Sequence, residues 1–71
     1  MNLLLLAEND RQSSGEFTVA GRRAEHIRAV LRAKPGDILR AGMLDGKLGT
    51  ARLHSLDRNM AVLGEVAFDR E

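Results

Sequence analysis

The sequence predicts a small, mainly β barrel of about five strands with one helix. Three observations support this fold class. The chain has 71 residues, which allows one domain with a modest core. Most of it consists of short apolar or alternating segments separated by Gly, Asn and Asp, as expected for strands joined by turns. Only the stretch between Gly21 and Pro35 has apolar residues at helical spacing.

The first part of the chain is predicted to contain two strands. Residues 2–7 form a leucine-rich run that is expected to be a buried strand, and the polar residues 8–15 an exposed loop. Residues 16–20 alternate around Phe17 and Val19, the pattern of a short second strand. The leucine run is far shorter than a membrane span and has no basic leader, so it predicts neither a signal peptide nor a membrane anchor.

The helix is predicted to end before Pro35, because proline disfavours helical geometry at the residue that precedes it. Arg28 and Arg32 lie on one flank of its apolar face, and His26 lies on the other. The turn that follows the helix is expected to use Asp37 as an acceptor of backbone hydrogen bonds. The apolar face itself comprises Ala24, Ile27, Val30 and Leu31.

The second half of the chain is predicted to form the remaining strands. Residues 38–44 and 47–56 flank Asp45-Gly46, a strong hairpin signal. After a polar turn, residues 60–68 form the last strand. The inward face of that strand is expected to comprise Met60, Val62, Val66 and Phe68.

The hairpin signal also predicts a register between its two strands. A tight two-residue turn pairs Leu39 with Arg52, which places Arg40 and Arg52 on opposite faces of the sheet. Without a bulge, the two arginines cannot both join one basic surface. Whether either of them belongs to the basic surface of the domain is left open by the sequence.

Basic residues are concentrated in the middle of the chain. The net charge is only +1, but residues 22–52 carry eight basic side chains against three acidic ones, a local net charge of +5, while the segments on either side are each −2. A polyanion would therefore meet a basic centre rather than a uniformly basic protein. The eight basic residues are Arg22, Arg23, Arg28, Arg32, Lys34, Arg40, Lys47 and Arg52.

Several kinds of site are not predicted. There is no cysteine, which excludes a disulfide framework and a thiolate metal site. The histidines and acids show no metal-ligand spacing, and no nucleophile-with-base pattern or phosphate-cradling glycine loop is present. Phe17 and Phe68 are the only aromatic residues besides the two histidines, and both suit core positions. Nucleic-acid recognition is therefore expected to use backbone, ribose and groove shape rather than base stacking.

The segment between residues 21 and 37 resembles the N-terminal signature of the RsmE family. That signature runs His-Ile, two residues, Val-Leu-Arg, three residues, Gly-Asp. The opening MNLLLL and the hairpin segment LDGKLGTARLHSLD are also similar to the family, so the resemblance covers nearly the whole chain. The residues that match the signature in order and spacing are His26, Ile27, Val30, Leu31, Arg32, Gly36 and Asp37.

The resemblance implies that residues 1–71 are the PUA-like RNA-binding domain of a ribosomal RNA methyltransferase. RsmE enzymes are cytoplasmic homodimers that use S-adenosylmethionine to methylate N3 of a uridine in small-subunit ribosomal RNA. A C-terminal SPOUT domain, to which nothing in this chain corresponds, holds the cofactor and forms the dimer. No catalytic, cofactor-binding or metal-binding residue is therefore expected here. The implied partners are small-subunit ribosomal RNA and the SPOUT domain, with no membrane.

The candidate RNA contacts are cationic side chains of the helix and its adjoining loops. Such groups neutralise phosphates and release counterions, and the helical arginines are expected to form one exposed cationic ridge. Two members have structural alternatives: His26 could instead hydrogen-bond a backbone carbonyl, and Arg32 could pair with Asp37. The candidates are Arg22, Arg23, His26, Arg28, Arg32, Lys34 and Lys47.

Two other functions are compatible with the sequence. One is a stand-alone, S4-like RNA-binding module, which needs a second helix near the N-terminus, where strands are predicted. The other is a small barrel that binds an oxyanion or a protein partner, which predicts no affinity for RNA. Charge alone does not separate these alternatives from the RNA-binding barrel, because most basic side chains are simply solvated.

Overall fold

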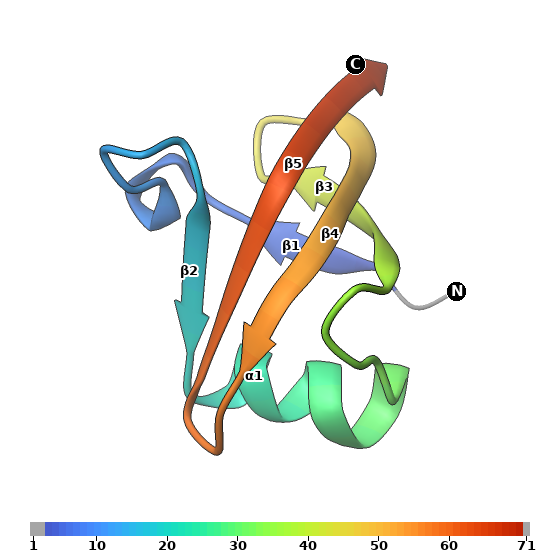
Figure 1. The fold of residues 1–71 in the computed structure, drawn as a ribbon. Coiled ribbons are helices and arrows are strands. Elements are labelled where there is room, and N and C mark those ends of the chain that lie inside the picture. The colour runs from blue at the N-terminus through green and yellow to red at the C-terminus, as the bar shows by residue number, and fades with distance from the viewer. Residues whose placement is uncertain (1–2, 71) are drawn as a thin grey trace.

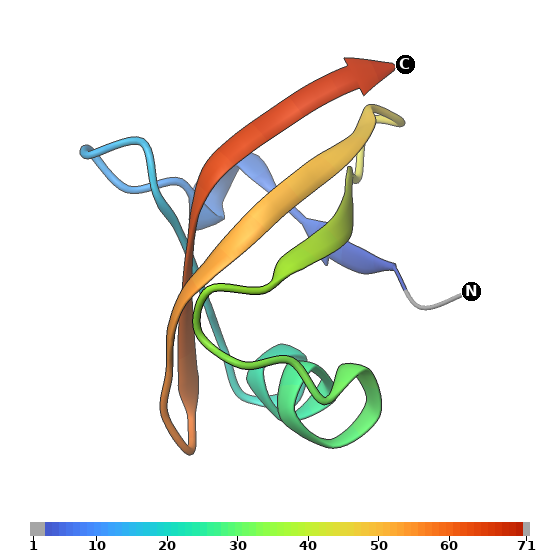
Figure 2. The ribbon, with the colours of Figure 1, turned by 45° about the vertical axis from the view of Figure 1, so that its right-hand side comes forward.

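The computed structural model describes residues 3–70, which form one five-stranded sheet that curls nearly into a barrel (Figure 1). The predicted fold class is confirmed, with one helical segment beneath one end of the sheet (Figure 2). The predicted start of the first strand, at residue 2, lies outside the described residues. In the sheet order β1-β3-β4-β5-β2, the strands are β1 (Leu4–Leu6), β3 (Ile38–Met43), β4 (Leu48–Leu56), β5 (Met60–Arg70) and β2 (Phe17–Ala20).

The strand pairing requires one crossover. β1 and β3 are parallel, whereas β3–β4, β4–β5 and β5–β2 are antiparallel. Parallel neighbours cannot be joined by a hairpin, and the connection between them contains the 3₁₀ turn η1 (Glu8–Asp10), β2 and the helical segment. The crossover brings the helix to the end of the barrel where β4 turns into β5, and there the N–H of Gly21 donates to the carbonyl of Asn59 at 3.1 Å.

The core is aliphatic and is filled from all five strands and from one face of the helical segment. This segment is α-helical over α1 (Arg22–His26) and continues as a π-helical turn, η2 (Ile27–Leu31). Ala24 and Ile27 are buried as predicted, but Val30 is half-exposed, because a π turn is wider than an α turn and rotates the residues that follow. No described helix is long and apolar enough to cross a membrane. The largest fully buried side chains are Phe17, Leu4, Leu6, Ile27, Leu53, Leu63 and Val19.

The helix ends at Arg32, which adopts a left-handed conformation with φ 54° and ψ 38°. The next N–H, of Ala33, donates back to the carbonyl of Ile27 at 3.2 Å, as in the caps that usually place glycine at the left-handed position. In the turn that follows, a carboxylate oxygen of Asp37 accepts the backbone N–H of Lys34 at 2.9 Å. The predicted helix stop and the predicted role of Asp37 are both confirmed.

The β3–β4 hairpin has a different register from the predicted one. The N–H of Met43 donates to the carbonyl of Lys47 at 2.8 Å, so residues 44–46 form a three-residue loop, with Gly46 at φ 107°. Such loops place a left-handed residue, usually glycine, at their last position. Arg52 consequently pairs with Ile38, one residue away from the predicted partner. The expectation that Arg40 and Arg52 lie on opposite faces is wrong, because Arg40 follows Ile38 by two residues and shares its face.

β5 contains a bulge that changes which residues face the core. Glu65 has φ 49° and interrupts the pairing with β4 between Gly64 and Ala67, as expected where an extra residue is inserted into a strand. Before the bulge, Met60 is half-exposed, contrary to the prediction, because the inward residues there are its neighbours in the alternation. The residues of β5 that contribute to the core are Ala61 and Leu63 before the bulge and Val66 and Phe68 after it.

Candidate nucleic-acid interface

The predicted RNA contacts do not form one continuous surface. Most of them lie on the helical segment and the turn after it, at one end of the barrel (Figure 1). Lys47 lies in the β3–β4 hairpin, at the opposite end of the sheet. The candidates at the helical end are Arg22, Arg23, His26, Arg28, Arg32 and Lys34.

Arg23 is engaged in an intramolecular ion pair with Asp10. The pair is bidentate, with 2.5 Å from Nη1 to Oδ2 and 2.8 Å from Nη2 to Oδ1, and Nη1 also donates to the carbonyl of Leu5 at 3.3 Å. Asp10 is only 8% exposed and also accepts the N–H of Ala7 at 2.8 Å. The Arg23 hydrogen bonds lower the pKa of Asp10 against the opposing effect of burial. The expected ridge of helical arginines is therefore interrupted at Arg23, whose guanidinium holds the helix against the N-terminal strand.

Arg28 links the helix to the turn between β4 and β5. Its Nη1 donates to the carbonyls of Asp57 and Arg58 at 3.2 and 3.0 Å, and Nη2 pairs with the carboxylate of Glu25. These residues, with Leu56, line a shallow open depression between the helix and the turn. Arg28 is thus held in a defined orientation at the surface, half-exposed.

Arg58 was not among the predicted contacts, although its side chain is exposed and lines the same depression. It lies 30 residues from Arg28 in the sequence, within a segment that has a net negative charge. No local pattern could have joined it to the helix, since tertiary packing alone brings the β4–β5 turn there.

Three other candidates remain exposed around the helix. Among residues 3–70, no hydrogen bond or ion pair engages the side chains of Arg22, Arg32 or Lys34. The suggested Arg32–Asp37 pair is not formed, because Asp37 accepts a backbone N–H instead. His26 is half-buried, and within the described part of the chain its ring makes no hydrogen bond to a carbonyl.

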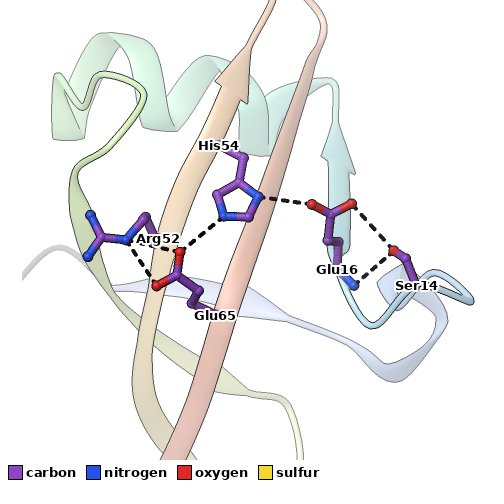
Figure 3. Close-up of polar contacts among 5 residues, drawn as sticks. All are labelled: Ser14, Glu16, Arg52, His54 and Glu65. Atoms are coloured by element: carbon purple, nitrogen blue, oxygen red, sulfur yellow. Dashed lines mark hydrogen bonds and ion pairs between the residues drawn. The ribbon is translucent and has the colours of Figure 1, made fainter.

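The outer face of the sheet carries a separate ionic network that the sequence did not predict (Figure 3). In it, the ring of His54 on β4 lies between two carboxylates, with Nδ1 2.9 Å from Glu16 and Nε2 3.5 Å from Glu65. Arg52 pairs with the same Glu65 at 3.2 Å. Gly64 permits this arrangement, because a Cβ atom there would lie 2.0 Å from the His54 ring.

The network neutralises its own charges. The hydrogen bond to Glu16 is the main cause of a raised pKa at His54, assisted by Glu65. Hydrogen bonds from His54 and then Arg52 lower the pKa of Glu65. Although Arg40 and Arg52 share the outer face, Arg52 is committed to this network and also donates to the carbonyl of Gly36 at 2.6 Å. Two carboxylates make this surface a poor site for a polyanion, and no group of described residues has the geometry of a metal site.

The family of the chain follows from a comparison with known domains. Residues 19–65 match the family model described as the RNA methyltransferase PUA domain. The chain belongs to this family. The matched segment begins in β2 and includes the whole helical segment, the β3–β4 hairpin and the network residues of β4 and β5. The expected PUA-like domain is therefore confirmed.

Solved structures support the same assignment. The PUA domain aligns over 100% of its length with a predicted RNA methyltransferase from Thermotoga maritima, at 28% identity and a TM-score of 0.76. It also aligns over 97% of its length with a hypothetical protein at 21% identity and a TM-score of 0.75, a likeness of fold alone. The chain spans 31% and 28% of these two proteins, less than a third of their length. No curated protein matches it.

The S4-like alternative is wrong. It requires a second helix near the N-terminus, whereas the structure has β1, the short turn η1 and β2 before the single helical segment. The family match also favours the RNA-binding barrel over a barrel that binds an oxyanion or a protein.

Proposed function

We propose that this PUA domain binds small-subunit ribosomal RNA and positions it for a methyltransferase that modifies N3 of a uridine. In this proposal the reaction takes place in the cytoplasm, on a separate C-terminal SPOUT domain of the same polypeptide that also forms a homodimer. That domain would bind S-adenosylmethionine, which supplies the methyl group. The residues of the PUA domain would contribute affinity and orientation and take no part in the chemistry.

The observation that carries the proposal is the set of exposed cations around one end of a domain from an RNA methyltransferase family. Arg22, Arg32 and Lys34 have side chains without partners among the described residues, so binding a phosphate would break no ion pair within this part of the fold. Arg28 and Arg58 extend the surface across the depression to the β4–β5 turn. Arg28 is already oriented by two carbonyls, which reduces the entropy lost when it binds.

The composition of this surface favours contacts to the RNA backbone. Neither phenylalanine is available for stacking, because Phe17 is buried and its ring packs edge-on against Phe68 at 6.5 Å. Arginine and lysine side chains would contact phosphates, which position an RNA helix without reading its sequence. Sequence selection would then depend on the shape of the RNA and on the catalytic domain.

The proposal is tested by titrating a small-subunit ribosomal RNA hairpin at several salt concentrations. The isolated domain is expected to bind with a Kd on the order of 10⁻⁴–10⁻⁶ M and to lose affinity as salt rises, because counterions are released. The double charge reversal Arg28→Glu and Arg32→Glu should abolish this binding. A salt-independent Kd, or unchanged binding in the double variant, would contradict the assignment of this surface.

A further inference from the structure

One part of the outer sheet surface is apolar instead of charged. On β1, Leu5 is 49% exposed, and on β4, Leu48 is 36% exposed. In the hairpin loop that joins β3 to β4, Leu44 is 69% exposed. Leu3, which precedes β1, is half-buried beside them. We call these four side chains the leucine patch.

The leucine patch is contiguous because Gly42 lies at its centre. Gly42 pairs with Leu5 on one side and with Leu48 on the other. A Cβ atom on Gly42 would lie 3.2 Å from a methyl group of Leu3 and 3.2 Å from one of Leu48. The leucines therefore gather over a glycine that has no side chain to separate them, and none of them belongs to the buried core.

A contiguous apolar surface of this kind requires an explanation. Single exposed leucines are ordinary in soluble proteins, whereas clustered ones mark surfaces that another protein covers. RNA is a poor candidate for the patch, since phosphates are bound by cations and base stacking needs aromatic rings. The patch is also at the opposite end of the sheet from the helical cations (Figure 1).

The end of β5 indicates what covers the patch. Arg70, the last described residue, pairs with Leu48 at the start of β4, so β5 ends beside the patch (Figure 2). The chain spans only 31% of the predicted RNA methyltransferase that it resembles. In a longer protein, the polypeptide that follows β5 would emerge at the edge of the patch.

We infer that the leucine patch is the surface against which the catalytic domain of the same polypeptide docks. The inference rests on the proposed function for the existence of that domain. Interfaces between domains of one chain bury about 600–1,500 Å² and have an apolar centre with a polar rim. The leucines supply the centre and Lys47 lies at the rim. Lys47 is thereby assigned to the domain interface instead of to the RNA surface. Docking would fix the direction in which the helical cations present RNA to the active site.

The test compares variants of the full-length protein by hydrogen exchange. The double variant Leu5→Lys and Leu44→Lys should lower protection of amides in the β3–β4 hairpin by about tenfold or more, because the docked state opens. The matched control is Ile38→Lys, since Ile38 is 61% exposed on β3 but outside the patch. Equal protection in the double variant and the control would overturn the inference.

Two further readouts separate the possible causes. RNA affinity of the chain of residues 1–71 should be the same in wild type and in the double variant, within about twofold, since the cations are untouched. If the patch is protected in the full-length protein but uridine methylation is absent, the docking surface stands and the proposed function fails. If residues 1–71 instead form a dimer in sedimentation that Leu44→Lys dissolves, the patch binds a second copy and the inference is wrong.

Discussion

Two ionic clusters of this domain use the same kinds of side chain in different surroundings. Asp10 and Arg23 pair at the junction of η1 and the helix, where the carboxylate is 8% exposed. The network of Glu16, His54, Glu65 and Arg52 lies on the outer face of the sheet, where its side chains are at least a third exposed. One is a single bidentate pair and the other a chain of four groups, yet the smaller cluster is expected to contribute more to stability.

The difference follows from solvent. An exposed ion pair competes with water and salt and contributes little, whereas removing one partner of a buried pair leaves a desolvated charge without compensation. The Asp10 cluster therefore holds the helix in place, and the outer network mainly sets the charge of its surface. A third group of cations, around the end of the helix, has no ionic partner within the described residues and is available to a ligand.

The largest effect is expected for Asp10→Ala. It removes the acceptor of two Arg23 hydrogen bonds and of the Ala7 N–H, and should lower the free energy of unfolding by about 2 kcal/mol, a value reduced because the Arg23 side chain is partly exposed. Urea denaturation measures this change. Asp45→Ala, in the exposed hairpin loop, is the control and should change stability by less than about 0.5 kcal/mol. Similar values for the two variants would mean that burial does not distinguish the clusters.

Gly64→Ala should disrupt the outer network without affecting the inner pair. The new Cβ atom would overlap the His54 ring, so the ring must swing away from Glu16 and lose the contact that raises its pKa. An NMR titration of the His54 ring protons should then give a pKa closer to its ordinary value than in wild type. Gly15→Ala, whose added Cβ meets no atom within 4 Å, should leave the titration unchanged.

The outer network also predicts a dependence of stability on pH. Because the pKa of folded His54 is raised above its unfolded value, its contribution is fully present below the unfolded pKa and is lost as pH rises through the folded pKa. Thermal unfolding of wild type and His54→Gln should therefore differ near pH 6 and converge near pH 9. Convergence at the acidic end instead would show that the histidine is not stabilised in its charged form.

The smallest change in stability is expected for the cations without partners. Arg32→Ala combined with Lys34→Ala should alter the free energy of unfolding by less than about 0.5 kcal/mol, while RNA affinity at low salt falls by about tenfold because two phosphate contacts are lost. Arg52→Ala provides the comparison, since its guanidinium is already paired with Glu65. If both variants weaken RNA binding equally, the outer face also takes part in binding.

Local sequence patterns predicted the order of the elements well. Alternation and turn residues located all the strands, and Pro35 together with Asp37 located the end of the helix. These features depend on residues a few positions apart, whose preferences hold in any context. The fold class followed because a chain this short, with one amphipathic helix and several short strands, has few compact arrangements.

Registers and partners were decided by the tertiary structure. One extra residue in the hairpin loop moved Arg40 and Arg52 to the same face, and the bulge at Glu65 changed the inward face of β5, because strand faces alternate and a shift of one residue inverts them. Asp10 and Arg23 are 13 residues apart, and His54 and Glu16 are 38 apart. The sequence by itself determined that the centre of the chain is basic; only the packing of distant segments decided which of those charges are neutralised within the fold and which remain for RNA.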